Sequence, residues 1–575
     1  MYILGLNAYH GDSSACIYQD GVLIAATEEE RIRRIKHWAG LPVEAIKFCL
    51  AEAKIQLTDI DYITVSRDPK AKLGEKVIRT LKNGISLKAV KDRGANSIKI
   101  TGIKKDIADA LGYDVKQLKA KVEFIEHHRS HMASSFHVSP FEEAAILSID
   151  GMGDFSSTMR GIGRGNSIEV MDSVSYPHSL GIFYTSFTQY LGFPHYGDEY
   201  KVMGLSPYGT PKYTDKVWDV IIKKNNGLFE LNPLYFKHFK EGVAMSWESG
   251  SPEIGRIFSD AFITQFGPLR QKGEELTQYH KDLASSVQLV TEEIIFMLAE
   301  DLYHKTGLKN LCISGGVAQN SVANGKILAN TSFEHLFVPP AGHDAGTSVG
   351  SALYHYHVNL KHERLPFEHQ AYTGAQFSND EIKLYLDKEN ISYEFIQEEK
   401  DLIENVANLL HKGRVIGWFQ GRAEFGPRAL GNRSIIVDPS RDDAKQLLNS
   451  KIKRRESFRP FAPSILKEAT LDYFEVMDDV PFMEKVYQIK EEKRSLIPAV
   501  THVDGSGRLQ TVTEQDNSRY YRLIKKFSEL SGIPILLNTS FNENEPIVNN
   551  PQQAIDCFLR TDMDTLVLEN FIISK

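Results

Sequence analysis

The sequence predicts an α/β protein of two domains, and three observations support this. An apolar strand–turn–strand plan at residues 2–29 recurs at residues 144–174. Two glycine-rich loops follow, each between a short apolar strand and a helix. A polar stretch, KHERLPFEHQAY, then reads as a linker, and strands and helices begin again beyond it. We therefore predict two α/β domains, covering residues 1–360 and 373–575.

The repeated plan is the strongest of these observations. Each copy has a buried strand, a turn of Asp, Ser and Gly, and two more strands; the turns read NAYHGDSS and IDGMGDFSS. Paired turns of this kind hold nucleotide phosphates in the actin, sugar-kinase and acetate-kinase superfamily, because their N–H groups and hydroxyls bind anions. The first domain is thus expected to be a duplicated, ribonuclease H-like fold of the actin type. Two unrelated hairpins are the alternative.

The glycine-rich loops point to the same cleft. SGGVAQN places Gly315 and Gly316 directly before a helix start, where a ligand can approach the backbone and anions are favoured. PPAGHDAG leads into the next helix and contains Asp344. Both loops in this order after the duplicated plan indicate a ligand-binding cleft.

Bulk properties narrow the class of protein. The chain has 575 residues, 42% hydrophobic and 25% charged, as is ordinary for a folded soluble protein, and a net charge of −8 argues against a surface that grips nucleic acid. The N-terminus lacks the basic region of a signal peptide, and no stretch approaches the ~20 apolar residues that span a bilayer. We expect a cytoplasmic protein. Four cysteines without a CxxC pair fit a reducing compartment: Cys16, Cys49, Cys312 and Cys557.

The segment EHHRSHMASSF is a candidate metal site. If it is helical, His127 and His131 share one face at a spacing of four residues, and His128 with His131 is the competing pair. Asp150 closes the following strand, and Asp344 lies in the second glycine-rich loop. Two imidazoles with one or two carboxylates leave open positions on a metal, which is typical of a catalytic site.

The second domain has basic side chains in loops rich in Gly, Pro and Ser. Arginines in rigid turns suit bidentate recognition of phosphate, and this reading is favoured for Arg428 and Arg459, which are flanked by proline. A nucleic-acid patch or a solvated face is the alternative, and it is preferred for Arg454 and Arg455. Short polar donors after a buried strand would suit in-plane hydrogen bonds to a small planar group: Asn538, Thr539 and Ser540.

These motifs together resemble known families. HxxxH before a strand ending in Asp-Gly, then SGGVAxN and PPxxxDxG, resembles the threonylcarbamoyl-transfer proteins of tRNA modification. EFGPRALGNRSI and KRRESFRPFAPS add a resemblance to the ATP-dependent O-carbamoyltransferases of antibiotic and nodulation-factor biosynthesis. The likeness runs nearly end to end, and it includes NAYHGDSSA, TEEER and YKVMGLSPYG.

The resemblance implies a reaction on two sites. A YrdC-like second domain would form carbamoyladenylate from carbamoyl phosphate and ATP with Mg²⁺, and the first domain would transfer the carbamoyl group. Iron(II), with Mn²⁺ or Zn²⁺ as alternatives, would bind to His127, His131, Asp150 and Asp344. The nucleotide in the first domain would meet Gly151, Lys201, Gly315, Gly316 and Asn320. Carbamoyl phosphate and ATP in the second domain would meet Arg428, Lys453, Arg459, Arg508, Asn538 and Ser540. His10 and Asp12 are the candidates for the catalytic proton acceptor.

The expected partner is a small-molecule hydroxyl acceptor, with neither nucleic acid nor membrane bound and a homodimer possible. The family often reads Glu-Gly-Lys where this chain has Glu199-Tyr200-Lys201, a bulkier turn that bears on acceptor fit. The basic stretch 70–106 reads as a solvated helical face, with a lid or partner surface as the alternative. A tRNA-modifying threonylcarbamoyl transferase and a non-catalytic ATP-binding regulator are the competing functions. The fused activating domain and the net negative charge argue against the tRNA-modifying transferase. The intact metal set argues against the non-catalytic regulator.

Overall fold

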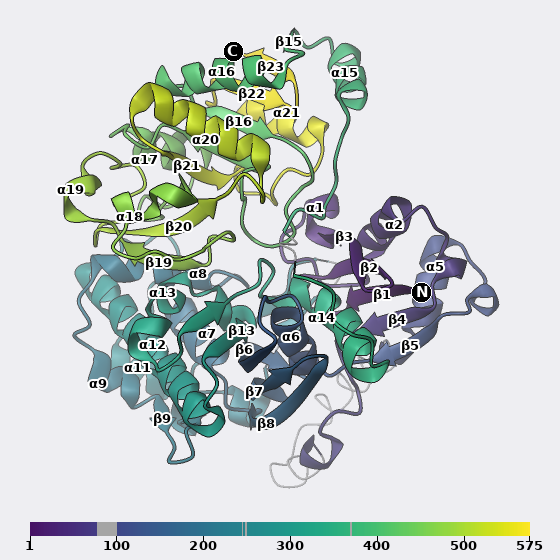
Figure 1. Ribbon diagram of the computed structural model, residues 1–575. Coiled ribbons are helices and arrows are strands. Elements are labelled where there is room, and N and C mark those ends of the chain that lie inside the picture. The colour runs from purple at the N-terminus through teal and green to yellow at the C-terminus, as the bar shows by residue number, and fades with distance from the viewer. Residues whose placement is uncertain (77–99, 244, 248–249, 368–370) are drawn as a thin grey trace. The chain divides into compact units, whose positions relative to one another are not determined.

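The computed structural model describes residues 1–76, 100–243, 245–247, 250–367 and 371–575 (Figure 1). It divides into two compact units: Met1–Ala323 with Ile327–Gln370, and Asn324–Lys326 with Ala371–Lys575. The domain bounds 1–360 and 373–575 stay a prediction. Most of the basic stretch 70–106 lies outside the described residues. Among the described helices, none combines the length and the apolar character needed to cross a bilayer.

The first unit contains two five-stranded sheets with the same plan. The first sheet has the order β3-β2-β1-β4-β5 and the second the order β8-β7-β6-β13-β14. In each sheet three strands pair antiparallel in succession; a fourth strand pairs parallel to the first of these, and a fifth pairs parallel to the fourth. The predicted α/β duplication of the ribonuclease H-like, actin type is therefore confirmed. The strands are β1 (Tyr2–Asn7), β2 (Ser14–Gln19), β3 (Val22–Glu28), β4 (Tyr62–Val65), β5 (Lys121–Phe124), β6 (Glu143–Gly153), β7 (Ser156–Arg164), β8 (Ser167–Ser175), β13 (Asn310–Ser314) and β14 (His335–Phe337).

The helices of the two halves correspond as well. Each half ends in a helix that packs on the sheet of the other half: α6 packs on β6 and β13, and α14 packs on β1 and β4. These two helices also pack against each other, which brings their residues to the centre of the first unit (Figure 1). The corresponding helices are α2 (Val43–Glu52) and α12 (Gln278–Thr306), α5 (Ile103–Leu111) and α13 (Ser321–Asn330), and α6 (His127–Phe136) and α14 (Thr347–Leu353). The other elements are α1 (Glu29–Arg33), α7 (Leu180–Tyr190), α8 (Glu199–Leu205), α9 (Thr214–Trp218), α10 (His238–Glu241), α11 (Asp260–Phe266), β9 (Ile221–Lys223), β10 (Phe229–Leu231), β11 (Met245–Ser246) and β12 (Glu253–Ile254).

Local sequence explains where these elements begin and end. β1 is a continuous apolar run, as expected for a strand with neighbours on both sides, and its leucines lie in the core. α12 begins at a capping box between Thr277 and His280, and it ends where Gly307 adopts a φ of +66°. The carboxylate of Glu29, from the TEEER run, accepts the N–H of Ala45 at 2.8 Å and so caps the start of α2.

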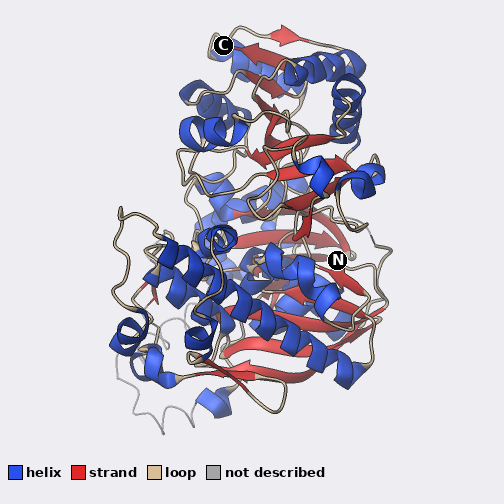
Figure 2. Cartoon of the chain, turned by 90° about the vertical axis from the view of Figure 1, so that its left-hand side faces the viewer, coloured by secondary structure: helices blue, strands red, loops and turns tan. Residues whose placement is uncertain are grey.

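The second unit is a mixed nine-stranded sheet with flanking helices (Figure 2). Its core surrounds Trp418, which is fully buried on β16. The unit is α/β as predicted, whereas its likeness to YrdC proteins stays a prediction. In sheet order the strands are β15 (Glu394–Phe395), β23 (Phe571–Ser574), β22 (Thr565–Leu568), β16 (Ile416–Phe419), β17 (Arg433–Val437), β21 (Ile535–Ser540), β18 (Ala462–Leu466), β20 (Ser506–Val512) and β19 (Lys485–Gln488). The helices are α15 (Asn379–Lys388), α16 (Glu399–His411), α17 (Ala444–Leu447), α18 (Thr470–Tyr473), α19 (Glu491–Arg494), α20 (Ser518–Ser531) and α21 (Pro551–Arg560).

Candidate metal centre and arginine cluster

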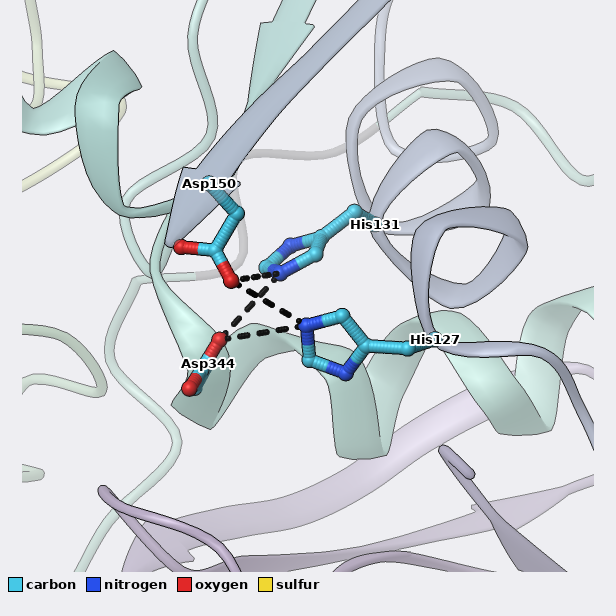
Figure 3. A group of neighbouring side chains, drawn as sticks. All are labelled: His127, His131, Asp150 and Asp344. Carbon is cyan, nitrogen blue, oxygen red and sulfur yellow. Dashed lines mark hydrogen bonds and ion pairs between the residues drawn. The ribbon is translucent and has the colours of Figure 1, made fainter. Parts of the chain in front are cut away.

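Four side chains converge in the first unit, and we call them the metal group: His127 and His131 of α6, Asp150 of β6 and Asp344 of the loop before α14 (Figure 3). All four are buried, and one ligand atom of each lies within 4.8 Å of the others. The Nε2 atom of His127 lies 3.2 Å from Asp150 Oδ2 and 3.5 Å from Asp344 Oδ1. The corresponding distances from His131 Nε2 are 3.9 and 3.3 Å. Ligands about 2.1 Å from a tetrahedral ion are about 3.4 Å apart, so this donor set fits a metal ion.

The structure decides between the two possible histidine pairs. His127 and His131, one helical turn apart, point to the same place, whereas His128 points to β6 (Figure 3 draws the first two). Its Nδ1 atom lies 2.8 Å from the hydroxyl of Ser148. His128 is therefore outside the metal group.

Helix α6 is anchored at both ends. At its start, the carboxylate of Glu126 accepts the N–H of Arg129 at 2.8 Å. At its end, the guanidinium of Arg364 donates to the carbonyl oxygens of Phe136 at 3.1 Å and Ser139 at 2.7 Å. Because orphan groups at both helix ends are satisfied, the histidines project from a fixed helix.

In each carboxylate of the metal group, one oxygen faces the two histidines and the other contacts a residue outside the group. Asp150 Oδ1 accepts the N–H of Gly316 at 2.8 Å, and Asp344 Oδ2 lies 2.6 Å from His10 Nδ1. Burial and Asp344 raise the pKa of Asp150, but hydrogen bonding and charge from the two histidines outweigh them and lower it to about 2. Burial also raises the pKa of Asp344, while His10 and the same histidines hold it well below its usual range. Both acids are thus ionised and able to act as ligands.

The two predicted catalytic residues lie in different environments. His10 contacts the metal group through Asp344, whereas Asp12 pairs with His37 at 2.7 Å. Burial raises the pKa of Asp12, but His37 lowers it overall; Asp12 in turn raises the pKa of His37 to about 9 against the effect of burial. His37 was missed by the sequence reasoning. The sequence feature that could have pointed to His37 is the TEEER run, because Glu30 of that run accepts the backbone N–H of His37 at 2.7 Å.

The residues of the first unit that are predicted to bind nucleotide also make structural contacts within that unit. Gly315 adopts a φ of +97°, which glycine takes without strain, and its N–H donates to Gly342. Asn320 caps α13 and exchanges two hydrogen bonds of 3.0 Å with Gln288. The ammonium of Lys201 lies 2.9 Å from Asp198. Contact with a nucleotide stays a prediction for Gly151, Lys201, Gly315, Gly316 and Asn320.

The second unit gathers positive charge in what we call the arginine cluster: Arg428, Arg455, Arg459 and Arg508. Burial and the charge of Arg459 lower the pKa of Arg428 to about 10. Burial and the other three arginines hold the pKa of Arg508 well below its usual range. Glu456 lies 3.5 Å from Arg459, but in the described part of the chain no carboxylate pairs with Arg428 or Arg508. Arg428 and Arg508 therefore keep positive charge that no carboxylate of the described residues neutralises.

The other predicted ligands of the second unit bind neighbouring segments of the protein. Lys453 is 1% exposed, and its ammonium lies 2.9 and 2.7 Å from two oxygens of Asn542 and 3.2 Å from the Ser540 hydroxyl. The amide of Asn538 donates to three oxygens: Ala429 O at 3.2 Å, Ser464 Oγ at 3.1 Å and Gln510 Oε1 at 3.0 Å. Direct contact with a ligand stays a prediction for Lys453, Asn538 and Ser540.

Comparison with known proteins adds to this geometry. The family model of the carbamoyltransferase N-terminus matches residues 2–353, and that of the carbamoyltransferase C-terminus matches residues 407–575. The protein belongs to the carbamoyltransferase family. It is 42% identical over 610 residues to the uncharacterized protein sll1178 of Synechocystis, with 100% of this chain and 97% of that protein covered. It is 38% identical over 582 residues to the nodulation protein NolNO of Sinorhizobium fredii (99% and 80% covered). It is 26% identical over 575 residues to the nodulation protein U of Bradyrhizobium diazoefficiens (94% and 92% covered).

Proposed function

We propose that the protein is an ATP-dependent O-carbamoyltransferase. The second unit would form carbamoyladenylate from carbamoyl phosphate and ATP, and the first would transfer the carbamoyl group to a hydroxyl of a small-molecule natural product. The arginine cluster carries this proposal, because Arg428 and Arg508 have no carboxylate partner within the described residues. Guanidinium groups held in this way bind phosphate oxygens well, and both substrates of the activation step are phosphates.

The activation step would have two parts, hydrolysis of carbamoyl phosphate and adenylation of the carbamate. Carbamoyl phosphate loses its phosphoryl group to water, which gives carbamate and phosphate. A carbamate oxygen then attacks the α-phosphorus of ATP, the bond to the bridging oxygen breaks, and pyrophosphate leaves with Mg²⁺. Negative charge grows on the phosphate oxygens during this step, and Arg428, Arg459 and Arg508 would stabilise it.

The transfer step needs a proton acceptor. The acceptor's hydroxyl oxygen attacks the carbonyl carbon of carbamoyladenylate, the bond to the phosphate oxygen breaks, and AMP leaves. His10 is the better candidate for the hydroxyl proton: its Nδ1 faces Asp344, which leaves Nε2 for the substrate. Asp12 is the weaker candidate because its pairing with His37 lowers its pKa and therefore its basicity.

The donors of the metal group suit iron(II), with manganese or zinc as alternatives. His127, His131, Asp150 and Asp344 would hold the ion, and a bound ion would supply Lewis acidity toward the oxygens of the mixed anhydride. Gly315 and Gly316 lack side chains and would let the adenylate approach the backbone of this loop closely. The net charge of −8 favours a small acceptor over tRNA.

One experiment tests the proposal directly. The purified protein is mixed with ATP, Mg²⁺ and carbamoyl phosphate, and released pyrophosphate and phosphate are measured; ATP without carbamoyl phosphate is the control. Pyrophosphate release that requires both substrates supports activation. A folded protein that releases none rules the proposal out. Hydroxyl compounds are then screened by mass spectrometry for the gain of one carbamoyl group, which identifies the acceptor.

A further inference from the structure

A single buried carboxylate organises the loop that carries Arg428. This segment, residues 424–433, follows β16 and runs into the first residue of β17, and we call it the arginine loop. Its first residue, Glu424, is 2% exposed. Its Oε1 atom accepts three backbone N–H groups of the same loop: Leu430 at 2.7 Å, Asn432 at 2.9 Å and Arg433 at 3.2 Å. A carboxylate that binds three N–H groups forms strong, directional hydrogen bonds, so it fixes the path of the backbone.

Neighbouring strands bind the carbonyl side of the same loop. The carbonyl of Leu430 accepts from the Gln510 amide at 2.9 Å and from the Tyr372 hydroxyl at 3.0 Å. The carbonyl of Gly431 accepts from the indole N–H of Trp418 at 2.8 Å. The backbone of the arginine loop is thus held through both its N–H groups and its carbonyl groups, and Glu424 is the shared acceptor of three of the N–H groups.

Among the residues that the structure describes, Glu424 has no ion-pair partner that would explain its burial. Its second oxygen, Oε2, is buried and has no hydrogen-bond partner within the residues that the structure describes. Burying a carboxylate without a cation is unfavourable, and the three bonds to the loop compensate for it. The carboxylate therefore acts on the loop backbone.

We propose that Glu424 is the positioning residue of the arginine loop, and that it holds Arg428 where the guanidinium receives a phosphate-type anion. The inference rests on the proposed function, because that function assigns the anion to Arg428. Glu424 bonds to the loop backbone and would act through Arg428. Displacement of a binding group by about 1 Å can cost about a hundredfold in rate, so control of this backbone bears directly on the activation step.

The test measures binding of inorganic pyrophosphate to the full-length protein by calorimetry. Glu424→Ala leaves three buried N–H groups without an acceptor, so we expect affinity to fall by about tenfold or more. Glu424→Gln keeps an acceptor oxygen and should stay within about threefold of the wild type. If Glu424 acts through Arg428, the double variant Glu424→Ala with Arg428→Ala should bind no more weakly than Arg428→Ala alone.

Two further variants serve as controls. Tyr372→Phe removes one hydroxyl that donates to the loop, and it should weaken binding by about two- to threefold; it replaces Glu424→Ala if that variant does not fold. Asp564 accepts the N–H of Val415 at 2.7 Å at the opposite end of β16, so Asp564→Asn should leave pyrophosphate affinity unchanged. Pyrophosphate release from ATP and carbamoyl phosphate is measured in parallel, and KM for carbamoyl phosphate should rise more than kcat falls.

The outcomes separate this inference from the proposed function. The positioning role is overturned if Glu424→Ala binds pyrophosphate as tightly as the wild type; Tyr372→Phe is judged in the same way if it replaces that variant. It is also overturned if the double variant loses affinity by the full sum of the losses in Glu424→Ala and Arg428→Ala. A wild type that binds pyrophosphate but releases none from its substrates overturns the proposed function, while the binding series still decides the role of Glu424. A wild type that binds no pyrophosphate overturns both.

Discussion

The metal group and the arginine cluster differ in how the protein balances their charges. In the metal group, two carboxylates face two imidazoles, and the remaining carboxylate oxygens are fixed by Gly316 and His10. In the arginine cluster, Glu456 lies near Arg459, while Arg428 and Arg508 have no carboxylate partner within the described residues. The first group offers lone pairs and suits a cation, whereas the second offers only N–H donors and suits an anion. One chain therefore presents two groups with opposite chemistry, as the proposed division into activation and transfer would require.

The largest expected effect comes from separating the two groups by mutation. Arg508→Ala or Arg428→Ala should reduce pyrophosphate release by a hundredfold or more, roughly, because the developing phosphate charge loses a fixed partner. His131→Ala should spare most activation and stop transfer. Pyrophosphate release and carbamoyl transfer are measured on the same preparations.

Synthetic carbamoyladenylate sharpens this comparison. It should restore transfer in the arginine variants and leave the metal-group variants inactive, because only the latter lack the transfer site. Arginine variants that stay inactive with the adenylate supplied, while folded and loaded with metal, would show that the two groups do not divide the reaction in this way.

The next effect concerns the metal group alone. His127→Ala should lower iron affinity by about 10- to 100-fold or more, since it removes a ligand. His128→Ala should leave iron content nearly unchanged, because His128 faces Ser148. Metal content after purification and dialysis is measured by mass spectrometry. Equal losses in the two variants would contradict the helical register seen here.

A smaller effect is expected from a glycine beside the metal group. A Cβ at residue 153 would lie 2.0 Å from the ring of His127, so Gly153→Ala must displace that ring and should weaken iron binding by about tenfold. A Cβ at residue 151 would meet nothing within 4 Å, so Gly151→Ala should keep the wild-type iron content. Iron titration of both variants tests the pair, and unchanged affinity in Gly153→Ala would mean that the ring can move freely.

The smallest effect is a pH dependence of stability at the pair of Asp12 and His37. The pKa of His37 is about 9 in the folded protein and about 6.5 in an unfolded chain, so its contribution is complete below about pH 6.5 and disappears as pH rises through about 9. Because the pKa of Asp12 is lowered, the contribution also fades in strong acid. The His37 side chain is 30% exposed, so we expect only about 1 kcal/mol.

Thermal unfolding of His37→Gln against the wild type measures this contribution. The difference in Tm should be greatest near about pH 6 and vanish near about pH 10. His304→Gln is the control, since His304 is 70% exposed in its pair with Glu300. A difference that grows with pH would contradict the assignment.

Local spacing explains why the sequence predicted part of the metal group. A separation of four residues places two helical side chains on one face, so His127 and His131 could be paired from the sequence, although His128 remained an alternative. Asp344 lies 213 residues from His131, and no local rule predicts that contact; its place in the second glycine-rich loop made it a candidate, and the family resemblance implied the full set. The duplicated sheets were predictable because each copy keeps its strand–turn–strand pattern.

Other features depend on tertiary contacts that leave little trace in the sequence. Lys453 belongs to a basic run that resembles a solvated face, yet the fold buries it against oxygens of the Ser540–Asn542 turn. His37 follows Arg34 in a loop where both residues have positive φ, and no periodic pattern marks such a loop. Glu424 belongs to the motif EFGPRALGNRSI, which we interpreted through its arginine. The role of Glu424 depends on hydrogen bonds to the loop backbone, and these appear only in the folded loop.

The position of Asp344 has a consequence for the order of events during synthesis. The ribosome makes both histidines and Asp150 long before Asp344, and the last of the four donors becomes usable only when the chain before α14 packs beside α6. A nascent chain ending anywhere before residue 344 can hold an ion with three ligands at most. The complete set arises only after nearly all of the first unit has left the ribosome, so iron would enter a folded unit and would not guide its early folding.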